Sequence, residues 1–427
     1  MPRSFTPAGR IFIPFFAGNR NCMKTFVPSA LLAMAISACE PFTIPTAVRC
    51  LVMENRHVPG DRKGETACSG EPDTTLLLSA VAVPESYDWR RDTAYGNSGG
   101  RLLLYRNYSE VLSLETGAET EISTAASSHH LIGGHLFTEY AGDRGTVVKR
   151  DGDEICRYPE KERLLGLLPL DGDILTLGAP AGREGLVLRK NGSILLSAEG
   201  CSVFGSFDDA ARGRSGALYT DGGHWYFAYR NGEACFLVRD GTVKGVSMPL
   251  AVTRVLAVKC IDDEIWMVGR NGASCVLSRG KQCRLLSPSI TWEGAAIMDC
   301  GEGGVCVYGY GRNTHGDPCC IVQWPETGKE SLIPGQMAYP FCAPGGKLWW
   351  LGIDGRALTL SEEGTVVLSE RDCLFMGADC AAMAGNRLFL ALNPASEGGR
   401  PFLWEGGRKR ELDIYGYLTA VEVSPAR

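Results

Sequence analysis

Histidine is scarce in this chain, with six His among 427 residues, and there is no Cys-x-x-Cys pair. Zinc sites that depend on such spacing are therefore not indicated. Gly328-Lys329 lacks the further glycine of a phosphate-binding loop, and no Gly-x-Gly-x-x-Gly follows a strand pattern. We expect neither a metal ion nor a cofactor.

Basic residues are also in deficit. The chain has 43 Lys and Arg against 49 Asp and Glu, a net charge of −6. Residues 1–38 contain four basic residues and no acid, so the remainder carries 39 basic against 49 acidic residues, a net charge of −10. An acidic body lacks the positive footprint that binds nucleic acid. We expect no nucleic-acid partner.

No apolar run near the N-terminus is long enough to span a bilayer. Met23-Lys24 precedes a short apolar stretch that ends in small residues, the pattern of an export signal over residues 23–38. Translation is then expected to begin at Met23, with residues 1–22 an over-called start. Residues 39–74 contain scattered Pro, Gly and charges, which predicts a flexible tether.

The end of this signal resembles the lipobox of bacterial lipoproteins, because Ser37 and Ala38 stand directly before Cys39. The resemblance implies that Cys39 becomes the first residue and carries lipid, so that the bilayer is one partner. Glu40, where inner-membrane retention would favour Asp, suggests the outer membrane, on either its periplasmic or its surface side. The alternative is an ordinary cleaved signal with an incidental cysteine.

The remainder, residues 75–427, repeats one short pattern eight times: an apolar strand, a loop, a second apolar strand, a Gly-containing hairpin and a short outer strand. An apolar segment between units supplies a fourth strand. The hairpin glycines, taken as Gly117 through Gly406, recur about every 41 residues, which is the period of a propeller blade. Asn-Gly and Asp-Gly pairs supply the positive φ that tight hairpins require.

This spacing predicts an all-β propeller of eight four-stranded blades, with seven as the alternative. A ring must join its ends or leave an unpaired strand edge. We expect the C-terminal strand, Tyr417–Val423, to close the first blade beside Leu102–Tyr105, with Leu76–Val83 pairing at the same seam. The pattern resembles propellers in general and the uncharacterised propeller lipoproteins of Gram-negative envelopes. It carries no family-specific catalytic motif.

The cysteines and histidines admit two interpretations each. Cys275 and Cys283 stand symmetrically about Arg279 in one hairpin, so a cross-strand disulfide is one alternative and small buried hydrophobes the other. His129, His130 and His135 cluster in the second unit, but neighbours on a strand point apart, so joint metal binding would require a loop. Solvated histidines are the alternative.

Arginine is enriched in the loops that we expect to join the second and third strands of each blade, about twice what composition predicts, and Lys is absent there. In a propeller these loops share one face, and Arg suits bidentate recognition of carboxylate or phosphate. The alternative is that each Arg is solvated or pairs with a nearby acid. The predicted ligand-binding residues are Arg106, Arg144, Arg183, Arg230, Arg270, Arg312, Arg356 and Arg400.

Three functions remain open from the sequence. A membrane-tethered binding module that uses one propeller face, for an anionic glycan or a protein ligand, fits best, because no nucleophile and base stand together. An envelope enzyme acting on carbohydrate, a hydrolase or lyase with its site in the central mouth, is the second. A scaffold subunit of an envelope complex is the third. Fold alone does not choose between them.

Overall fold

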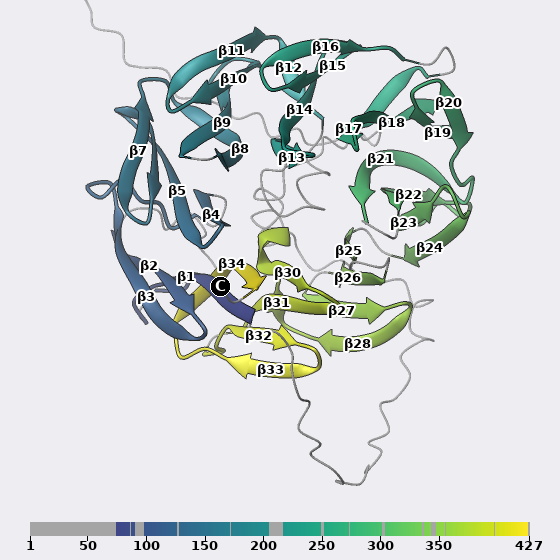
Figure 1. The fold of residues 1–427 in the computed structure, drawn as a ribbon. Helices are drawn as coiled ribbons and strands as arrows, with labels where there is room; N and C mark the ends of the chain where they lie inside the picture. Colours follow the sequence, from purple (N-terminus) through teal and green to yellow (C-terminus); the bar gives the residue numbers. More distant parts are fainter. Residues whose placement is uncertain are drawn as a thin grey trace, which may run out of the picture.

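The computed structural model describes residues 74–425, apart from residues 86, 90–97, 126–127, 171, 205–216, 249–251, 273, 301–303, 335–336, 343–346, 355 and 397. Cys39 and nearly all of the predicted signal and tether lie outside the described residues. The described chain is nearly all β, and its strands form eight antiparallel sheets arranged in a ring (Figure 1). The predicted eight-bladed propeller is confirmed.

Each sheet is one blade, and its strands run from the centre of the ring outward. Blade 1 is formed by β34 (Gly416–Pro425), β1 (Thr74–Ala82), β2 (Ser98–Arg106) and β3 (Ser109–Gly117). Blade 2 is formed by β4 (His129–Ile132), β5 (His135–Gly142), β6 (Gly145–Arg150) and β7 (Asp153–Tyr158). Blade 3 is formed by β8 (Glu162–Leu170), β9 (Asp173–Pro180), β10 (Gly185–Lys190) and β11 (Ser193–Glu199).

Blade 4 has an inner strand in two pieces that both pair with the second strand: β12 (Cys201–Val203), β13 (Tyr219–Asp221), β14 (His224–Asn231), β15 (Ala234–Arg239) and β16 (Thr242–Val246). Blade 5 is formed by β17 (Arg254–Ile261), β18 (Glu264–Asn271), β19 (Ser274–Arg279) and β20 (Gln282–Leu285). Blade 6 is formed by β21 (Ile290–Asp299), β22 (Val305–Asn313), β23 (Pro318–Trp324) and β24 (Lys329–Pro334).

Blade 7 is formed by β25 (Met337–Cys342), β26 (Leu348–Asp354), β27 (Ala357–Glu362) and β28 (Thr365–Glu370). Blade 8 again has a divided inner strand, interrupted by the 3-10 helix η4 (Ala378–Cys380): β29 (Cys373–Leu374), β30 (Ala381–Ala384), β31 (Arg387–Pro394), β32 (Phe402–Glu405) and β33 (Arg408–Glu411). Within the described residues, no helix is both long and apolar enough to cross a membrane.

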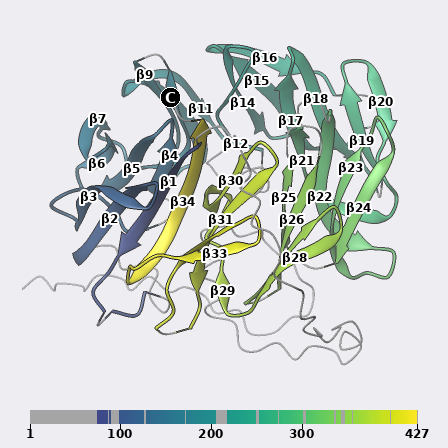
Figure 2. The same ribbon diagram turned by 60° about the horizontal axis from the view of Figure 1, so that its bottom comes forward.

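The C-terminal strand closes the ring, as predicted, but at a different neighbour. β34 pairs with β1 from Thr74↔Pro425 to Ala82↔Gly416, and β1 in turn pairs with β2. Figure 2 shows β34 alongside β1, the two ends of the described chain in one blade. The expectation that β34 lies directly beside Leu102–Tyr105 is wrong, because β1 takes that place and makes β2 the third strand of blade 1.

The tight turns carry the predicted conformation. Asp151-Gly152, Asn191-Gly192 and Asp240-Gly241 join the third and fourth strands of three blades. Both residues of each pair have positive φ, from 47° to 52° at the first position and from 80° to 96° at the glycine. Paired positive φ values are what a two-residue hairpin needs to match the twist of its strands.

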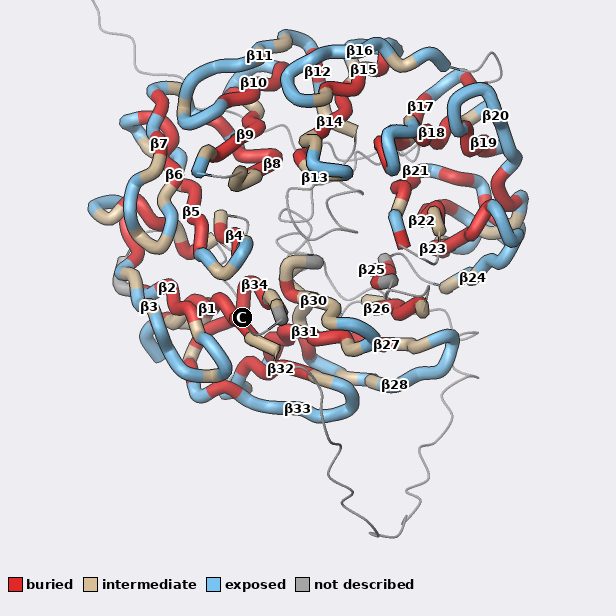
Figure 3. The backbone as a smooth tube through the Cα atoms, in the orientation of Figure 1, coloured by how far each residue is buried: buried red, intermediate tan, exposed pale blue. Residues whose placement is uncertain are grey.

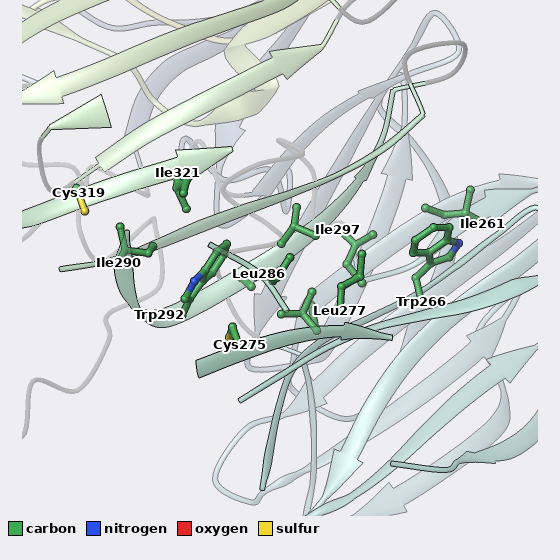
Figure 4. Packing of buried hydrophobic residues seen from close by; sticks show 14 residues of the cluster. Ile261, Trp266, Cys275, Leu277, Leu286, Ile290, Trp292, Ile297, Cys319 and Ile321 are labelled. Carbon is green, nitrogen blue, oxygen red and sulfur yellow. The ribbon is translucent and has the colours of Figure 1, made fainter. Parts of the chain in front are cut away.

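The core lies between the blades. Eight clusters of buried apolar residues are present among the described residues, and each joins one blade to the next around the ring. Figure 4 shows the cluster between blades 5 and 6, where Trp266, Trp292 and Ile321 point into the interface. The inner strands are largely buried and the outermost strands largely exposed (Figure 3). Each blade is therefore stabilised chiefly by its two neighbours.

Candidate functional site

The ring has two unlike faces. Since neighbouring strands are antiparallel, the connections from second to third strand and from fourth strand to the next blade lie on one face, here called the loop face. The turns from third to fourth strand lie on the other, here called the turn face. The structure places seven of the predicted arginines at second-to-third connections, on the loop face: Arg144, Arg183, Arg230, Arg270, Arg312, Arg356 and Arg400.

Arg106 is the exception. It ends β2, which is the third strand of blade 1, so Arg106 enters a third-to-fourth turn on the turn face. The prediction that Arg106 lies on the same face as the other arginines is wrong, because β1 is the second strand of blade 1 and β2 is the third. The second-to-third connection of blade 1 is the segment between β1 and β2, so Arg106 does not share a face with the other seven. Of those seven, which lie on seven different blades, Arg230 lines the pocket described below.

Four of the seven loop-face arginines have a nearby acid. Their ion pairs are Arg144–Glu121 at 2.7 Å, Arg183–Glu199 at 3.8 Å, Arg312–Glu293 at 3.4 Å, and Arg400–Asp413. Most of these side chains are about half exposed or more, so each pair contributes little stability, but it offsets the local charge. The other three are Arg230, Arg270 and Arg356, none of which makes an ion pair with a described residue.

A pocket of about 280 Å³ opens on the loop face between blades 4 and 5. Arg230, at the end of β14, and Glu233, in the following turn, come from blade 4. Thr253 and Arg254, which lead into β17, come from blade 5. The two blades therefore contribute one arginine each. The volume is near the lower end of small-molecule sites and suits one compact group rather than an extended ligand.

Two arginines line this pocket, and a third is the cross-strand neighbour of one of them. Arg230 and Arg254 line it, and Arg270 is the direct cross-strand partner of Arg254 in the pairing of β17 with β18. The Arg230 Nε donates to Ser202 Oγ at 3.1 Å, and the Arg270 Nε donates to Gly272 O at 2.6 Å. Both bonds use Nε. The side chain of the exposed Arg254 makes no hydrogen bond or ion pair with a described residue. Among the described residues that line the pocket, two are arginines and one, Glu233, is an acid.

The remaining lining is partly apolar. Phe204 and Met248 form part of the wall, and the buried Val255 and Cys235 lie deeper. Burial raises the pKa of the Cys235 thiol, although the Arg230 charge opposes this shift. Since a free thiol already titrates above neutrality, Cys235 is protonated at pH 7 and is a poor nucleophile. The lining suits binding of an anion rather than covalent catalysis.

The other predicted sites are not assembled. Cys275 and Cys283 are both free thiols: Cys283 is exposed and lies opposite Ser278, while Cys275 is buried. The predicted cross-strand disulfide is not formed, because the register separates the two side chains along the hairpin. Cys275 instead belongs to the core between blades 5 and 6, which is the other interpretation offered by the sequence.

The histidines are not solvated as a group. His129 and His130 lie on β4 and are buried, and burial lowers the pKa of His129 to about 4 while its Nε2 lies 2.5 Å from Ser123 O. The more exposed His135 pairs through Nδ1 with Asp151 at 2.5 Å. Among the described residues, no three His, Cys, Asp or Glu side chains gather in a way that would hold a metal ion.

Sequence reasoning did not find Arg254 or Thr253. Both precede or begin an inner strand, in a fourth-to-first connection, whereas the arginine pattern was sought only in second-to-third connections. Antiparallel pairing brings second-to-third and fourth-to-first connections to the same face. Arginines in both kinds of connection are therefore candidates for one site, and Arg254 is among them.

Comparison with known proteins adds to the fold only. No family model and no curated protein matches the chain. Among solved structures, "Dihydro-heme d1 dehydrogenase NirN in complex with DHE" matches 83% of this chain and 76% of its own at 10% identity, with a TM-score of 0.49. Apo AztD from Citrobacter koseri matches 82% of this chain and 98% of its own at 11% identity, with a TM-score of 0.43. BamB from Moraxella catarrhalis matches 75% and 95% at 8% identity, with a TM-score of 0.40. At such scores and identities the likeness carries no inference about ligand or activity.

Proposed function

We propose that this chain is a binding module that holds the carboxylate of an acidic sugar in the pocket between blades 4 and 5. One observation carries the proposal: Arg230 and Arg254, from adjacent blades, line the same pocket, and neither makes an ion pair with a described residue. Two guanidinium groups across a small concave site offer paired N–H donors to one carboxylate.

The rest of the lining supports a sugar as the carrier of that carboxylate. Glu233 and Thr253 offer acceptor oxygens to hydroxyl groups, and Phe204 gives an apolar surface for one side of a ring. The volume, about 280 Å³, suits one ring with its substituents.

We further propose that the module is lipid-anchored through Cys39 to the outer membrane, with residues 39–74 as the tether. Support comes from the sequence: an export signal over residues 23–38 that ends in small residues before the cysteine. Partition of the chain into detergent tests the anchor. The wild-type chain should enter the detergent phase and Cys39→Ala should remain in the aqueous phase; equal partition would refute lipid attachment.

Titration calorimetry with glycans tests the binding proposal. The full chain is titrated with an oligogalacturonate, with a neutral oligogalactose of the same length, and with an acidic peptide as a third arm. We expect the acidic glycan to bind best. Arg230→Ala and Arg254→Ala should each lower its affinity by about tenfold or more, since a hydrogen bond to a charged group contributes roughly 1.5–3 kcal/mol.

Arg183→Ala is the matched control, because Arg183 lies on the same face outside the pocket and only its weak pair with Glu199 is lost. It should leave the affinity within about twofold. Equal binding of neutral and acidic glycans, or equal losses from Arg183→Ala and Arg254→Ala, would contradict the proposal. Preference for the acidic peptide would identify a protein ligand at the same pocket.

A scaffold subunit would need a continuous apolar surface for a partner protein, and the described residues do not form one. The large apolar side chains that are exposed on strands lie on the outermost strands of six different blades: Val111, Ile194, Leu195, Val243, Leu285, Leu332, Val366 and Val367. Figure 3 shows the outermost strands around the rim of the ring. Exposed apolar residues scattered over different strands are normal on protein surfaces.

A further inference from the structure

Two buried thiols meet inside blade 6. Cys300 directly follows β21 and Cys306 is the second residue of β22, and their sulfur atoms lie 3.3 Å apart. Both side chains are buried, with 4% and 0% of their surface exposed. They belong to the apolar cluster between blades 6 and 7, and no disulfide joins them in this structure.

The strand register explains the contact. Cys306 is the cross-strand partner of Met298, and the Cys300 N–H donates to Gly304 O at 2.9 Å. Cys300 and Cys306 are thus diagonal neighbours whose side chains leave the same face of the hairpin, an arrangement within reach of side-chain contact. The nearby Cys320 belongs to the same cluster, but its sulfur contacts the Tyr308 hydroxyl at 3.8 Å.

We propose that Cys300 and Cys306 form a disulfide when the chain folds in an oxidising compartment. A disulfide has a sulfur–sulfur bond of about 2.0 Å, so the two sulfurs need to approach by about 1.3 Å. Cys300 stands at a strand end, where the backbone is less constrained than in the middle of a ladder. The bond would fasten the hairpin that joins the two inner strands of blade 6.

The reaction is thiol–disulfide exchange with a disulfide oxidant, either a protein or a small molecule. The thiolate of one cysteine attacks a sulfur of the oxidant, forms a mixed disulfide and releases one thiol. The second thiolate attacks the mixed disulfide, forms the Cys300–Cys306 bond and releases the second thiol. The two cysteines lose two protons and two electrons, and the oxidant gains the electrons. Because both thiols are buried in the folded chain, the exchange takes place during folding.

Digestion with trypsin places Cys300 and Cys306 together in one peptide, whose mass shows whether they form a disulfide. Cleavage after Arg284 and Arg312 releases the peptide Leu285–Arg312, whose only cysteines are Cys300 and Cys306. The full chain is refolded in a mixture of reduced and oxidised glutathione, denatured with an excess of a maleimide reagent, and digested. We expect this peptide to carry no maleimide and to weigh about 2 Da less than its reduced form, since two hydrogens are lost. Prior reduction with dithiothreitol should restore two labels.

Two further peptides serve as controls. Asn271–Arg279 contains Cys275 alone, and Asn313–Lys329 contains the adjacent pair Cys319 and Cys320. Both should be fully labelled in every sample. Cys300→Ser should leave Cys306 labelled after the same refolding; should that variant fail to fold, the wild-type peptides decide alone. Two maleimides, or two glutathiones, on Leu285–Arg312 from the refolded chain would overturn the proposal. The result does not depend on ligand binding at the pocket between blades 4 and 5.

Discussion

Asn107 and Leu76 hold each other by two hydrogen bonds. The Asn107 N–H donates to Leu76 O at 2.9 Å, and the Leu76 N–H donates to Asn107 Oδ1 at 2.9 Å. Leu76 lies near the start of the second strand of its blade, and Asn107 is the first residue of the third-to-fourth turn. The same reciprocal pair recurs in four other blades: Leu136–Asp151, Ile174–Asn191, Trp225–Asp240 and Leu348–Glu363.

This pair of hydrogen bonds also shows which kind of turn follows Arg106. All five turn residues have φ between 47° and 52°, a left-handed conformation in which Asn and Asp are favoured. Asn107 shares both the conformation and the bonding partner of the other four, so Arg106 precedes a third-to-fourth turn. It is equivalent to Arg150 and Arg239 and not to the loop-face arginines.

Asn191→Gly should lower the stability of the propeller by about 1–2 kcal/mol, because the buried Ile174 would lose the acceptor for its N–H while the left-handed turn is preserved. Asn191→Ala should cost about 1 kcal/mol more, since alanine is strained at φ 50°. Urea unfolding followed by tryptophan fluorescence measures both. Asn271→Gly is the control, and a loss as large at this exposed position would show that the side-chain bond is not the cause.

Much of the fold could be predicted from the sequence, because it depends on local signals. The Asp-Gly and Asn-Gly turns recur at the blade period. Tyr226, Trp266 and Trp349 lie on the second strands of their blades and are buried between blades. The place of Leu76–Ala82 could not be predicted in the same way. Second and third strands are both short and apolar, so the local pattern does not show which of them Leu102–Tyr105 would be.

The candidate site was predicted only in part, for a similar reason. Arg230 and Arg270 were identified from a repeat position, but the pocket exists because loops from two blades meet across an interface. Arg254 lies 24 residues after Arg230 in the chain and in a different kind of connection. Arg230 and Arg254 come close together because adjacent blades pack in the ring, and the repeat pattern of the sequence does not show this contact.

Among the twelve cysteines whose burial the structure describes, Cys283 should react first when the folded chain meets a maleimide reagent. It is the exposed member of these twelve, and the other eleven are buried. Cys235 should label slowly even at pH 8, since burial raises the pKa of its thiol despite the opposing charge of Arg230. Timed labelling with peptide mass spectrometry measures both rates. Rapid labelling of Cys235 would instead indicate an activated thiol and favour the enzyme alternative.

Glu422→Ala should weaken the seam of the ring by about 1 kcal/mol. The Glu422 carboxylate, on the C-terminal strand, accepts the N–H groups of Gly133 at 2.9 Å and Gly134 at 3.0 Å in blade 2. Faster limited proteolysis near either end of the described chain would report the loss. Glu411→Ala, at an exposed position on β33, should cleave at the wild-type rate, and equal acceleration by the two variants would rule out a role specific to the seam.

Glu139 should make the propeller less stable as the pH rises. Burial raises the pKa of this carboxyl from 4.5 to about 7, against the opposing effect of the Leu164 N–H that it accepts at 2.8 Å. Arg163 also lowers the pKa and Glu162 raises it. A group whose pKa is higher in the folded state stabilises below its unfolded value and loses that contribution as the pH passes its folded value. The loss therefore falls between pH 4.5 and about pH 7 and amounts to about 3 kcal/mol at most.

Glu139→Gln separates this carboxyl from all other titrating groups, because glutamine keeps an oxygen for the Leu164 N–H and carries no charge. At pH 5 the variant and the wild type should unfold at similar urea concentrations, since Glu139 is then protonated in the folded state. At pH 8 the variant should be the more stable, because the wild type must either bury a charge or lose the fold around it. Parallel pH profiles for the two proteins would mean that Glu139 is solvated and titrates as an ordinary carboxyl.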